Sequence, residues 1–183
     1  MKLLVVEDDA ALAAALAEGL AEAGYVVEIA RDGAEGEYLG ATETYAAAVL
    51  DLGLPGMAGL EVLGRWRAAG LTLPVLVLTG RDAWADKVAG FRAGADDYVL
   101  KPVRIEEVAL RLATLIRRAE GHAAARIEAG SLALDTATGL VTLAGLPLKL
   151  TAFEARLLRF LMHRKGRVVS RADLSEHMYD REA

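Results

Sequence analysis

The chain has 183 residues and a net charge of −5, and its 54% hydrophobic and 26% charged residues are typical of a folded globular protein rather than a disordered one. It contains no cysteine, which excludes disulfides, thiolate metal sites and thiol catalysis. The apolar run near the amino terminus is only four residues long before three acids, too short for a signal peptide or a membrane span, so we expect a cytoplasmic protein without a membrane partner.

Charge is distributed unevenly along the chain. Residues 1–120 carry a net charge of −7, whereas residues 121–183 carry +2. This asymmetry favours two modules with different partners. A charge of +2 does not by itself identify a nucleic-acid binder, and ordinary surface variation also produces such differences.

The first module alternates short apolar runs with helical patterns. Segment 33–42, which contains three glycines, has the weakest helical pattern. The apolar runs are nearly continuous, as in strands buried on both faces of a parallel sheet, and five strand–helix units of this kind predict a doubly wound α/β fold. The predicted strands are Leu3–Val6, Tyr25–Ala30, Ala46–Leu50, Pro74–Leu78 and Tyr98–Leu100.

Polar side chains stand at the ends of four of these strands. Because parallel strands bring their carboxyl ends to one edge of the sheet, where ligands bind, the joint pattern predicts a single site. For any one of these residues taken alone, a solvated or capping role is the more common one, and we expect Asp9 to cap a helix or face solvent. The residues are Glu7 and Asp8 after the first strand, Asp51 after the third, Thr79 after the fourth and Lys101 after the fifth.

These residue types indicate phosphoryl chemistry. Clustered carboxylates repel one another unless a cation joins them, and a ligand set made only of oxygen predicts a hard metal, Mg²⁺ or Mn²⁺. A carboxylate beside such a metal can attack phosphorus and become an acyl phosphate, while Lys101 neutralises phosphoryl charge and Thr79 donates a hydrogen bond. Asp51 is then the modified residue, and the glycines and Pro55 of the following loop leave room for the phosphate.

In their order and spacing, VVEDD, VLDLGLPGMAGLEVL, VLVLTGR and GADDYVLKP resemble a response-regulator receiver domain over residues 1–118. The resemblance implies a flavodoxin-like fold with a five-stranded parallel sheet and a cis peptide bond before Pro102. It implies that Asp51 is phosphorylated, that Glu7, Asp8, Asp51 and the carbonyl of Gly53 hold Mg²⁺, and that Thr79, Lys101 and Tyr98 bind the phosphate or act as the switch.

A phosphatase of the dehalogenase type is the competing enzyme, since it also uses an aspartate at a strand end. Such an enzyme needs a second aspartate two residues later as acid and base, and Gly53 stands at that position. We therefore favour a switch that modifies only itself, taking its phosphoryl group from a phosphohistidine or a small phosphodonor, over an enzyme that acts on an external substrate.

A second pattern follows a predicted linker over residues 119–126, in which we expect His122 to be solvated. Apolar residues alternate with period two over residues 132–134, 141–143 and 146–150, which predicts an antiparallel meander.

Two helices should follow this meander. Each begins with a capping box, Thr151 with Glu154 and Ser170 with Asp173. His163 and His177 lack the partners of a metal site, and we expect them on the surface or in packing contacts.

The meander, the run LTAFEARLLRFLMHRKGRVVSRADLSEHMYD and the upstream receiver together resemble the OmpR/PhoB class of winged-helix transcription factors. The resemblance implies that residues 127–183 are the first part of a smaller α+β winged-helix domain, and that the intact protein binds promoter DNA and receives phosphate from a sensor histidine kinase. We expect the recognition helix and wing to lie beyond Ala183, leaving the domain incomplete and its apolar face exposed. The alternative is a packing or partner-binding module without a DNA function.

Two surfaces follow from this resemblance. The active form should dimerise through the fourth helix, fifth strand and fifth helix, and basic residues of the second module should contact DNA phosphates. The dimer positions are Lys87, Asp96, Asp97, Glu107, Arg111 and Arg118, and the basic residues are Arg164, Lys165, Arg167 and Arg171.

Overall fold

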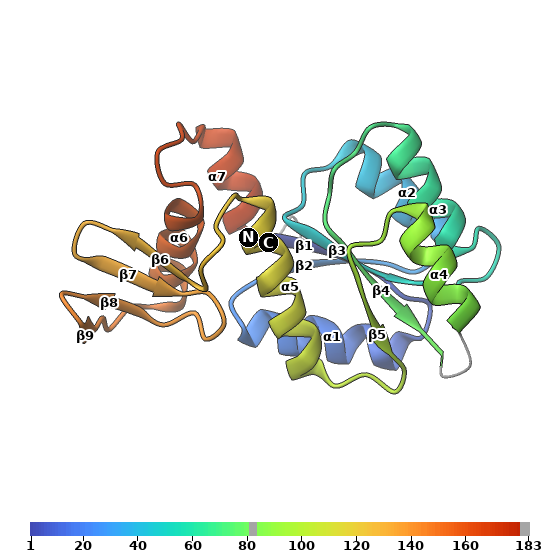
Figure 1. Cartoon of the computed structure of the whole chain (residues 1–183), viewed down its shortest axis with the longest axis horizontal. Helices are drawn as coiled ribbons and strands as arrows, with labels where there is room; N and C mark the ends of the chain where they lie inside the picture. Colours follow the sequence, from blue (N-terminus) through green and yellow to red (C-terminus); the bar gives the residue numbers. More distant parts are fainter. Residues whose placement is uncertain (81–83, 180–183) are drawn as a thin grey trace.

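The computed structural model describes residues 1–80 and 84–179, apart from the side chains of Trp84, Asp86 and Lys87. These residues form two modules that lie side by side (Figure 1). A parallel sheet with helices on both faces is followed by a small antiparallel sheet with two helices. The predicted fold class, a doubly wound α/β module followed by a smaller α+β module, is confirmed.

The first module is a five-stranded sheet in the order β2-β1-β3-β4-β5, and every neighbouring pair is parallel. Helices α1 and α5 cover one face, and α2, α3 and α4 cover the other (Figure 1). The strands are β1 (Lys2–Val6), β2 (Val26–Ala30), β3 (Ala47–Asp51), β4 (Val75–Thr79) and β5 (Asp97–Leu100). The helices are α1 (Ala10–Glu22), α2 (Gly33–Thr42), α3 (Gly59–Ala68), α4 (Trp84–Ala93) and α5 (Ile105–Ala119).

Strand β1 divides its side chains between two apolar cores. Leu3 and Val5 pack in the core with α1 and α5, whereas Leu4 and Val6 pack in the core on the opposite face. Every residue of β1, β3 and β4 is buried, as expected for strands covered on both faces. The central strands therefore form a rigid platform for the side chains at their ends.

Helix α2 forms despite its three glycines because they allow close packing. A Cβ at Gly36 would lie 2.6 Å from Val6 Cγ1, and one at Gly40 would lie 2.4 Å from Trp66 Cε2. Each glycine costs about 1 kcal/mol of helix propensity relative to alanine. Tertiary packing of α2 against the sheet and α3 offsets that cost, which is why the sequence pattern alone is weak here.

The second module begins with an antiparallel meander in sequence order, β6 (Arg126–Ala129), β7 (Leu132–Asp135), β8 (Val141–Leu143) and β9 (Leu146–Pro147). The sequence pattern does not predict β6, because only Ile127 and Ala129 alternate there. Helices α6 (Ala152–His163) and α7 (Arg171–Met178) begin at the two predicted capping boxes, and both boxes are confirmed. No helix in the described parts of the chain is long and apolar enough to cross a membrane.

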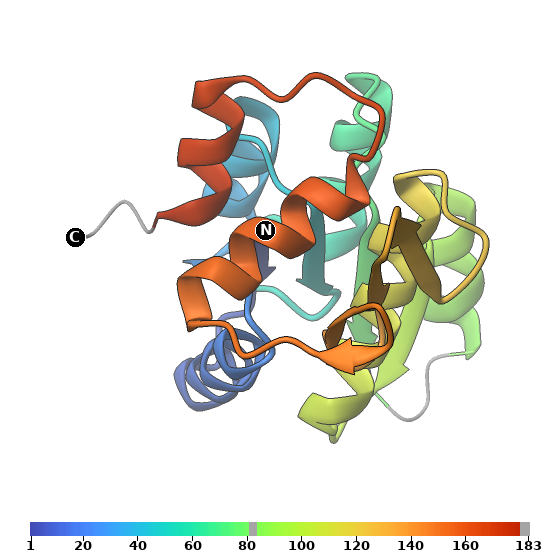
Figure 2. The same ribbon diagram turned by 90° about the vertical axis from the view of Figure 1, so that its left-hand side faces the viewer.

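Helix α6 of the second module packs on one side against the meander and on another against the first module. Leu158 and Met162 pack on the meander, whereas Leu157 and Phe160 join the core of the first module. Figure 2 shows α6 and α7 in front of the first module, which covers this face. The expected exposed apolar face is therefore partly buried: Phe160 is 1% exposed, whereas Phe153 and Leu161, at 39% each, remain exposed on the helix.

The segment between the modules, residues 120–125, is bonded to both. Arg117 Nη1 donates to the carbonyl of His122 at 2.9 Å and to that of Ala123. The Nε2 atom of His122 lies 2.7 Å from the carbonyl oxygen of His163 in α6. The expectation that His122 is simply solvated is wrong, because its ring is held against the second module.

Candidate functional site

Three carboxylates meet at the carboxyl ends of β1 and β3. Glu7 and Asp8 follow β1, Asp51 ends β3, and one carboxylate oxygen from each lies within 4.8 Å of the others. Glu7 is fully buried, Asp51 is 5% exposed and Asp8 is exposed. They line an open cavity of about 390 Å³, together with Thr79 and Lys101. The five strand-end residues predicted from the sequence thus converge on one cavity.

Lys101, directly after β5, places a positive charge between two of the acids. Its Nζ lies 2.9 Å from Glu7 Oε2 and 3.3 Å from Asp51 Oδ2. Burial alone would lower the pKa of Lys101, but the hydrogen bond to Glu7 and the charges of Asp51 and Glu7 together raise it. The cis peptide bond predicted before Pro102 is confirmed.

Glu7 is held in a place that disfavours its charge. Burial raises the pKa of Glu7, and the nearby charge of Asp51 adds to this, against the hydrogen bonds from Lys101 and from the Asp9 backbone. A divalent cation beside Glu7 would favour the ionised carboxylate and so offset the effect of burial on this acid.

Thr79 carries a buried hydroxyl without a partner. The residue is 2% exposed, and its Oγ1 has no hydrogen-bond partner within the described residues. A buried polar group left in this state costs about 1–3 kcal/mol. Because Thr79 lines the same cavity as Asp51, an acceptor oxygen bound there would satisfy the hydroxyl.

Backbone N–H groups orient two of the carboxylates. The N–H of Asp9 donates to Glu7 Oε1 at 3.1 Å, and that of Gly53 donates to Asp51 Oδ1 at 3.2 Å. The side chain of Asp9 in turn accepts from the N–H groups of Ala11 and Leu12, which confirms the predicted helix cap. Asp9 therefore supports the site through its backbone N–H, which orients the Glu7 carboxylate.

Only some glycines of the loop after β3 are required sterically. Gly56 has a φ of +72°, and a Cβ at Gly59 would lie 2.1 Å from the carbonyl oxygen of Asp51. At Gly53 a Cβ would make ordinary contacts of 3.6 Å or more with Asp51. Gly53 contributes its backbone, and leucine side chains that the sequence argument missed, Leu52 and Leu60, help to line the cavity.

The donor set fits a hard divalent cation. Three carboxylates with oxygen ligands, one of them exposed to water, match the preference of Mg²⁺ and Mn²⁺ for oxygen and for retained waters. Two buried acids share one lysine, so the described cluster has more negative than positive charge.

Tyr98 and the predicted dimer residues lie outside the described lining of this cavity. Tyr98 is half-buried, packs edge to face on Phe91 with ring centroids 5.7 Å apart, and is absent from the described lining of the cavity. Arg111 pairs with Asp97 and with Glu107 in the same chain, each at 2.8 Å. Asp96 pairs with Arg67 at 3.1 Å and Arg118 is exposed, whereas the side chain of Lys87 lies outside the described residues.

Three of the four basic residues predicted to contact DNA are engaged within the chain. Arg164 lies over the ring of Phe160 at 4.1 Å and 3.6 Å from Glu120, and Arg167 pairs with Glu120 at 2.9 Å. Lys165 donates to the carbonyl of Glu128 at 2.7 Å, while Arg171 is exposed. A phosphate contact by Arg171 would not require any of these described pairs to break.

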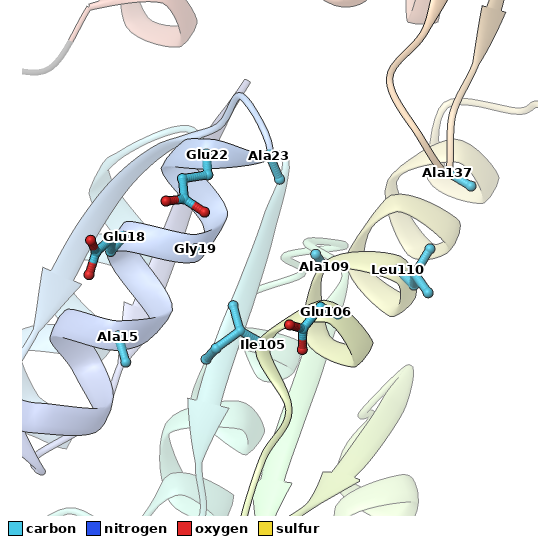
Figure 3. Close-up of a pocket in the computed structure, with 10 residues that line it drawn as sticks. All are labelled: Ala15, Glu18, Gly19, Glu22, Ala23, Ile105, Glu106, Ala109, Leu110 and Ala137. Carbon is cyan, nitrogen blue, oxygen red and sulfur yellow. The ribbon is translucent and has the colours of Figure 1, made fainter.

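A larger cavity, of about 670 Å³, lies between α1 and α5 (Figure 3). Figure 3 shows carboxylates of Glu18 and Glu22 on α1 and of Glu106 on α5 around it. A Cβ at Gly19 would lie 2.2 Å from Ile105 Cγ2, so the two helices pack closely beside it. Its described lining contains no cationic side chain and no hydroxyl, unlike the cavity of the carboxylate cluster.

Comparisons with known proteins agree with the fold. Residues 3–113 match the family model "Response regulator receiver domain", and residues 145–183 match "Transcriptional regulatory protein, C terminal". The chain is 45% identical to the two-component response regulator PhoP of Pseudomonas aeruginosa, over 98% of this chain and 80% of that protein. It is 41% identical to the transcriptional regulatory protein QseB of Escherichia coli O157:H7, over 98% of this chain and 82% of that protein.

Solved structures resemble the first module. A Francisella response-regulator receiver domain is 32% identical with a TM-score of 0.62, covering 64% of this chain and 98% of that one. The receiver domain of a sensor histidine kinase from Pseudomonas aeruginosa PAO1, with a magnesium ion coordinated in its active-site cleft, is 26% identical with a TM-score of 0.58. It covers 63% of this chain and 96% of that one.

Proposed function

This chain belongs to the OmpR/PhoB class of two-component response regulators, which control transcription, and from this premise we propose that phosphorylation of Asp51 switches it. The observation that carries the proposal is the convergence of Asp51 with two further acids, Lys101 and the unpartnered Thr79 hydroxyl in one open cavity. Each of these groups has a part in moving and holding a phosphoryl group.

Asp51 is the nucleophile of the transfer. One of its carboxylate oxygens attacks the phosphorus of a phosphohistidine on a sensor kinase, forming an O–P bond as the N–P bond breaks, and the leaving imidazole takes a proton from water. With a small donor such as acetyl phosphate, acetate leaves instead. Gly53 stands where a phosphatase of the dehalogenase type has its acid and base, so we propose that the protein turns over no external phosphoester.

Lys101 and the acidic pair provide the electrostatics. When bound, Mg²⁺ neutralises charge on the phosphoryl oxygens, and Glu7, Asp8, Asp51 and the carbonyl of Gly53 would hold it. Lys101 is within reach of Asp51 Oδ2 at 3.3 Å, so its Nζ can pair with a phosphoryl oxygen on that carboxylate. Lys101 now forms an ion pair with buried Glu7, and a cation bound beside Glu7 would take its place as the positive partner of that acid.

Thr79 couples phosphorylation of Asp51 to a conformational change. Its hydroxyl can donate to a phosphoryl oxygen, gaining the partner that it lacks in the unphosphorylated protein. We propose that Tyr98, within β5, follows this movement and repacks the face of α4, β5 and α5. Asp97, Glu107 and Arg111 then exchange pairs within one chain for pairs across a two-fold axis, which supports dimerisation and promoter binding.

Mass spectrometry tests the central step. Incubation with acetyl phosphate and Mg²⁺ should add one phosphoryl mass, and the addition should disappear in Asp51→Asn and in excess chelator. Asp9→Asn is the matched control: Asp9 lines the same cavity, and asparagine caps a helix as well as aspartate, so labelling should persist. Labelling of Asp51→Asn at the rate of the unmodified protein would refute the assignment.

A further inference from the structure

A small cavity lies at the junction of the two modules, and it shares no described lining residue with the carboxylate cavity. Its volume is about 20 Å³. Met1, Gly24 and Tyr25 line it from the receiver, and Arg156, Arg159 and His163 line it from α6, with Leu134 and Thr136 completing the wall. None of the described residues that line it is acidic.

Arg159 reaches the junction because two glycines leave space for its guanidinium. A Cβ at Gly24 would lie 1.7 Å from Arg159 Nη2, and one at Gly139 would lie 2.7 Å from Nη1. Nη1 donates to the carbonyl of Ala23 at 2.8 Å, and Nε donates to that of Ala155 at 3.3 Å. An arginine has five N–H donors, so donors remain for a further acceptor.

His163 adds a buried donor or acceptor with no partner. The residue is 7% exposed, and its Nδ1 has no hydrogen-bond partner within the described residues. Burial, with the charges of His122, Met1 and the neighbouring arginines, lowers the pKa of His163 to about 4. The ring is therefore neutral at pH 7, and the tautomer with its proton on Nδ1 would donate to an acceptor in the cavity.

Burial and the charges of Arg159, Arg156 and Arg164 also lower the pKa of the Met1 amino group to about 5. At pH 7 this amino group is therefore neutral, and the positive charge at the cavity is that of Arg156 and Arg159, which no carboxylate among the described lining residues balances. Buried charges in proteins are normally paired, so an anion is the species that this cavity favours.

From this geometry we infer that the cavity binds a single small inorganic anion, of the size and charge of chloride, between Arg156, Arg159 and His163. A volume of about 20 Å³ admits a species close to the size of one water, which requires roughly 10–15 Å³, and excludes phosphate and carboxylate ligands. Because both modules supply lining residues, the bound anion stabilises the closed contact between them. The concentration of the anion therefore tunes how readily the second module leaves the receiver.

Thermal unfolding in chloride, with gluconate replacing it at constant ionic strength, tests the inference. The full chain should gain on the order of 2–5 °C in Tm when chloride exceeds its Kd about tenfold. Arg156→Gln should lose most of this gain, since it removes one cationic wall while glutamine keeps a good helix former in α6. Arg171→Gln is the matched control, because it removes a charge from an exposed position of the same module and should keep the full gain.

A direct measurement completes the test. Crystals of the full chain grown in bromide should show an anomalous peak between the Arg156 and Arg159 guanidinium groups and the His163 ring. Equal Tm in chloride and gluconate, an undiminished gain in Arg156→Gln, or crystals without that peak would each overturn the inference and leave the cavity to a water molecule.

Discussion

Replacing Phe160 by alanine tests whether the two modules fold as one unit. Phe160 is 1% exposed and packs in the receiver core although it belongs to α6. Its ring lies between the ring of His177, 4.8 Å away between centroids, and the Arg164 guanidinium, 4.1 Å from the centroid. The substitution therefore opens a cavity at the junction and removes an aromatic and a cation–π contact together.

The expected cost is large. Buried phenylalanine to alanine substitutions cost about 3–5 kcal/mol, a range that includes roughly 0.5–2 kcal/mol for a cation–π contact of this kind. For a chain of this length, that cost corresponds to a fall in Tm on the order of 10 °C. The loss falls on the contact between the modules, because both contribute atoms to the cluster around Phe160.

Urea unfolding followed by two probes provides the assay. In the unmodified protein, tryptophan fluorescence, which reports on the receiver core through Trp66, and far-ultraviolet circular dichroism should change together. In Phe160→Ala the second module should unfold at lower urea and separate the two curves.

Phe153→Ala is the control on the same helix. Phe153 is 39% exposed, and its loss should cost less than about 1 kcal/mol. If Phe160→Ala costs no more than this control and the curves stay coincident, α6 does not pack on the receiver in solution.

Three other predictions concern the switch, the junction and the dimer. Thr79→Val should stabilise the unphosphorylated protein by about 1–3 kcal/mol in urea unfolding, because it removes an unsatisfied buried hydroxyl, while phosphorylation of Asp51 still proceeds but no longer promotes dimerisation. Burial lowers the pKa of His177 from 6.5 to about 3, so as the pH falls the unfolded chain binds a proton at this residue before the folded chain does. The stability that neutral His177 contributes is therefore present above pH 6.5 and is lost as the pH falls towards 3. In His177→Gln, the free energy of unfolding should decline less over this pH range. Charge reversal in Arg111→Glu should weaken phosphorylation-dependent dimerisation about tenfold in light scattering. The two-fold axis repeats the lost contact, and each copy contributes up to about 1 kcal/mol. An unchanged dimer would place the interface on another face.

The convergence of the strand-end residues could be predicted from the sequence because each of them is marked by a short local pattern. A strand that ends in a charge is visible in a few residues, and the parallel sheet then brings Glu7, Asp51 and Lys101 together by rule. The capping boxes at Thr151 and Ser170 are equally local, and both formed as expected.

The junction between the modules could not be predicted in the same way. It depends on contacts between distant segments, such as Arg159 with Ala23 and Lys2 with His177, which leave no periodic signal in either partner. A pattern of apolar residues on α6 indicates that a face is buried, but it does not say which surface covers that face. Helix α2 shows the same limit, because the packing that compensates its glycines comes from Val6 and Trp66.

Strand β1 links the acidic cluster to the second module. At one end it leads into Glu7, and at the other the N–H of Lys2 donates to Nδ1 of His177 at 3.0 Å. Five residues span roughly 16 Å in an extended strand, and β1 is hydrogen-bonded on both sides, by β2 and by β3. A change at the acidic end that weakened the contact at the other end would expose the Lys2 amide, and a faster hydrogen exchange of that amide would report it.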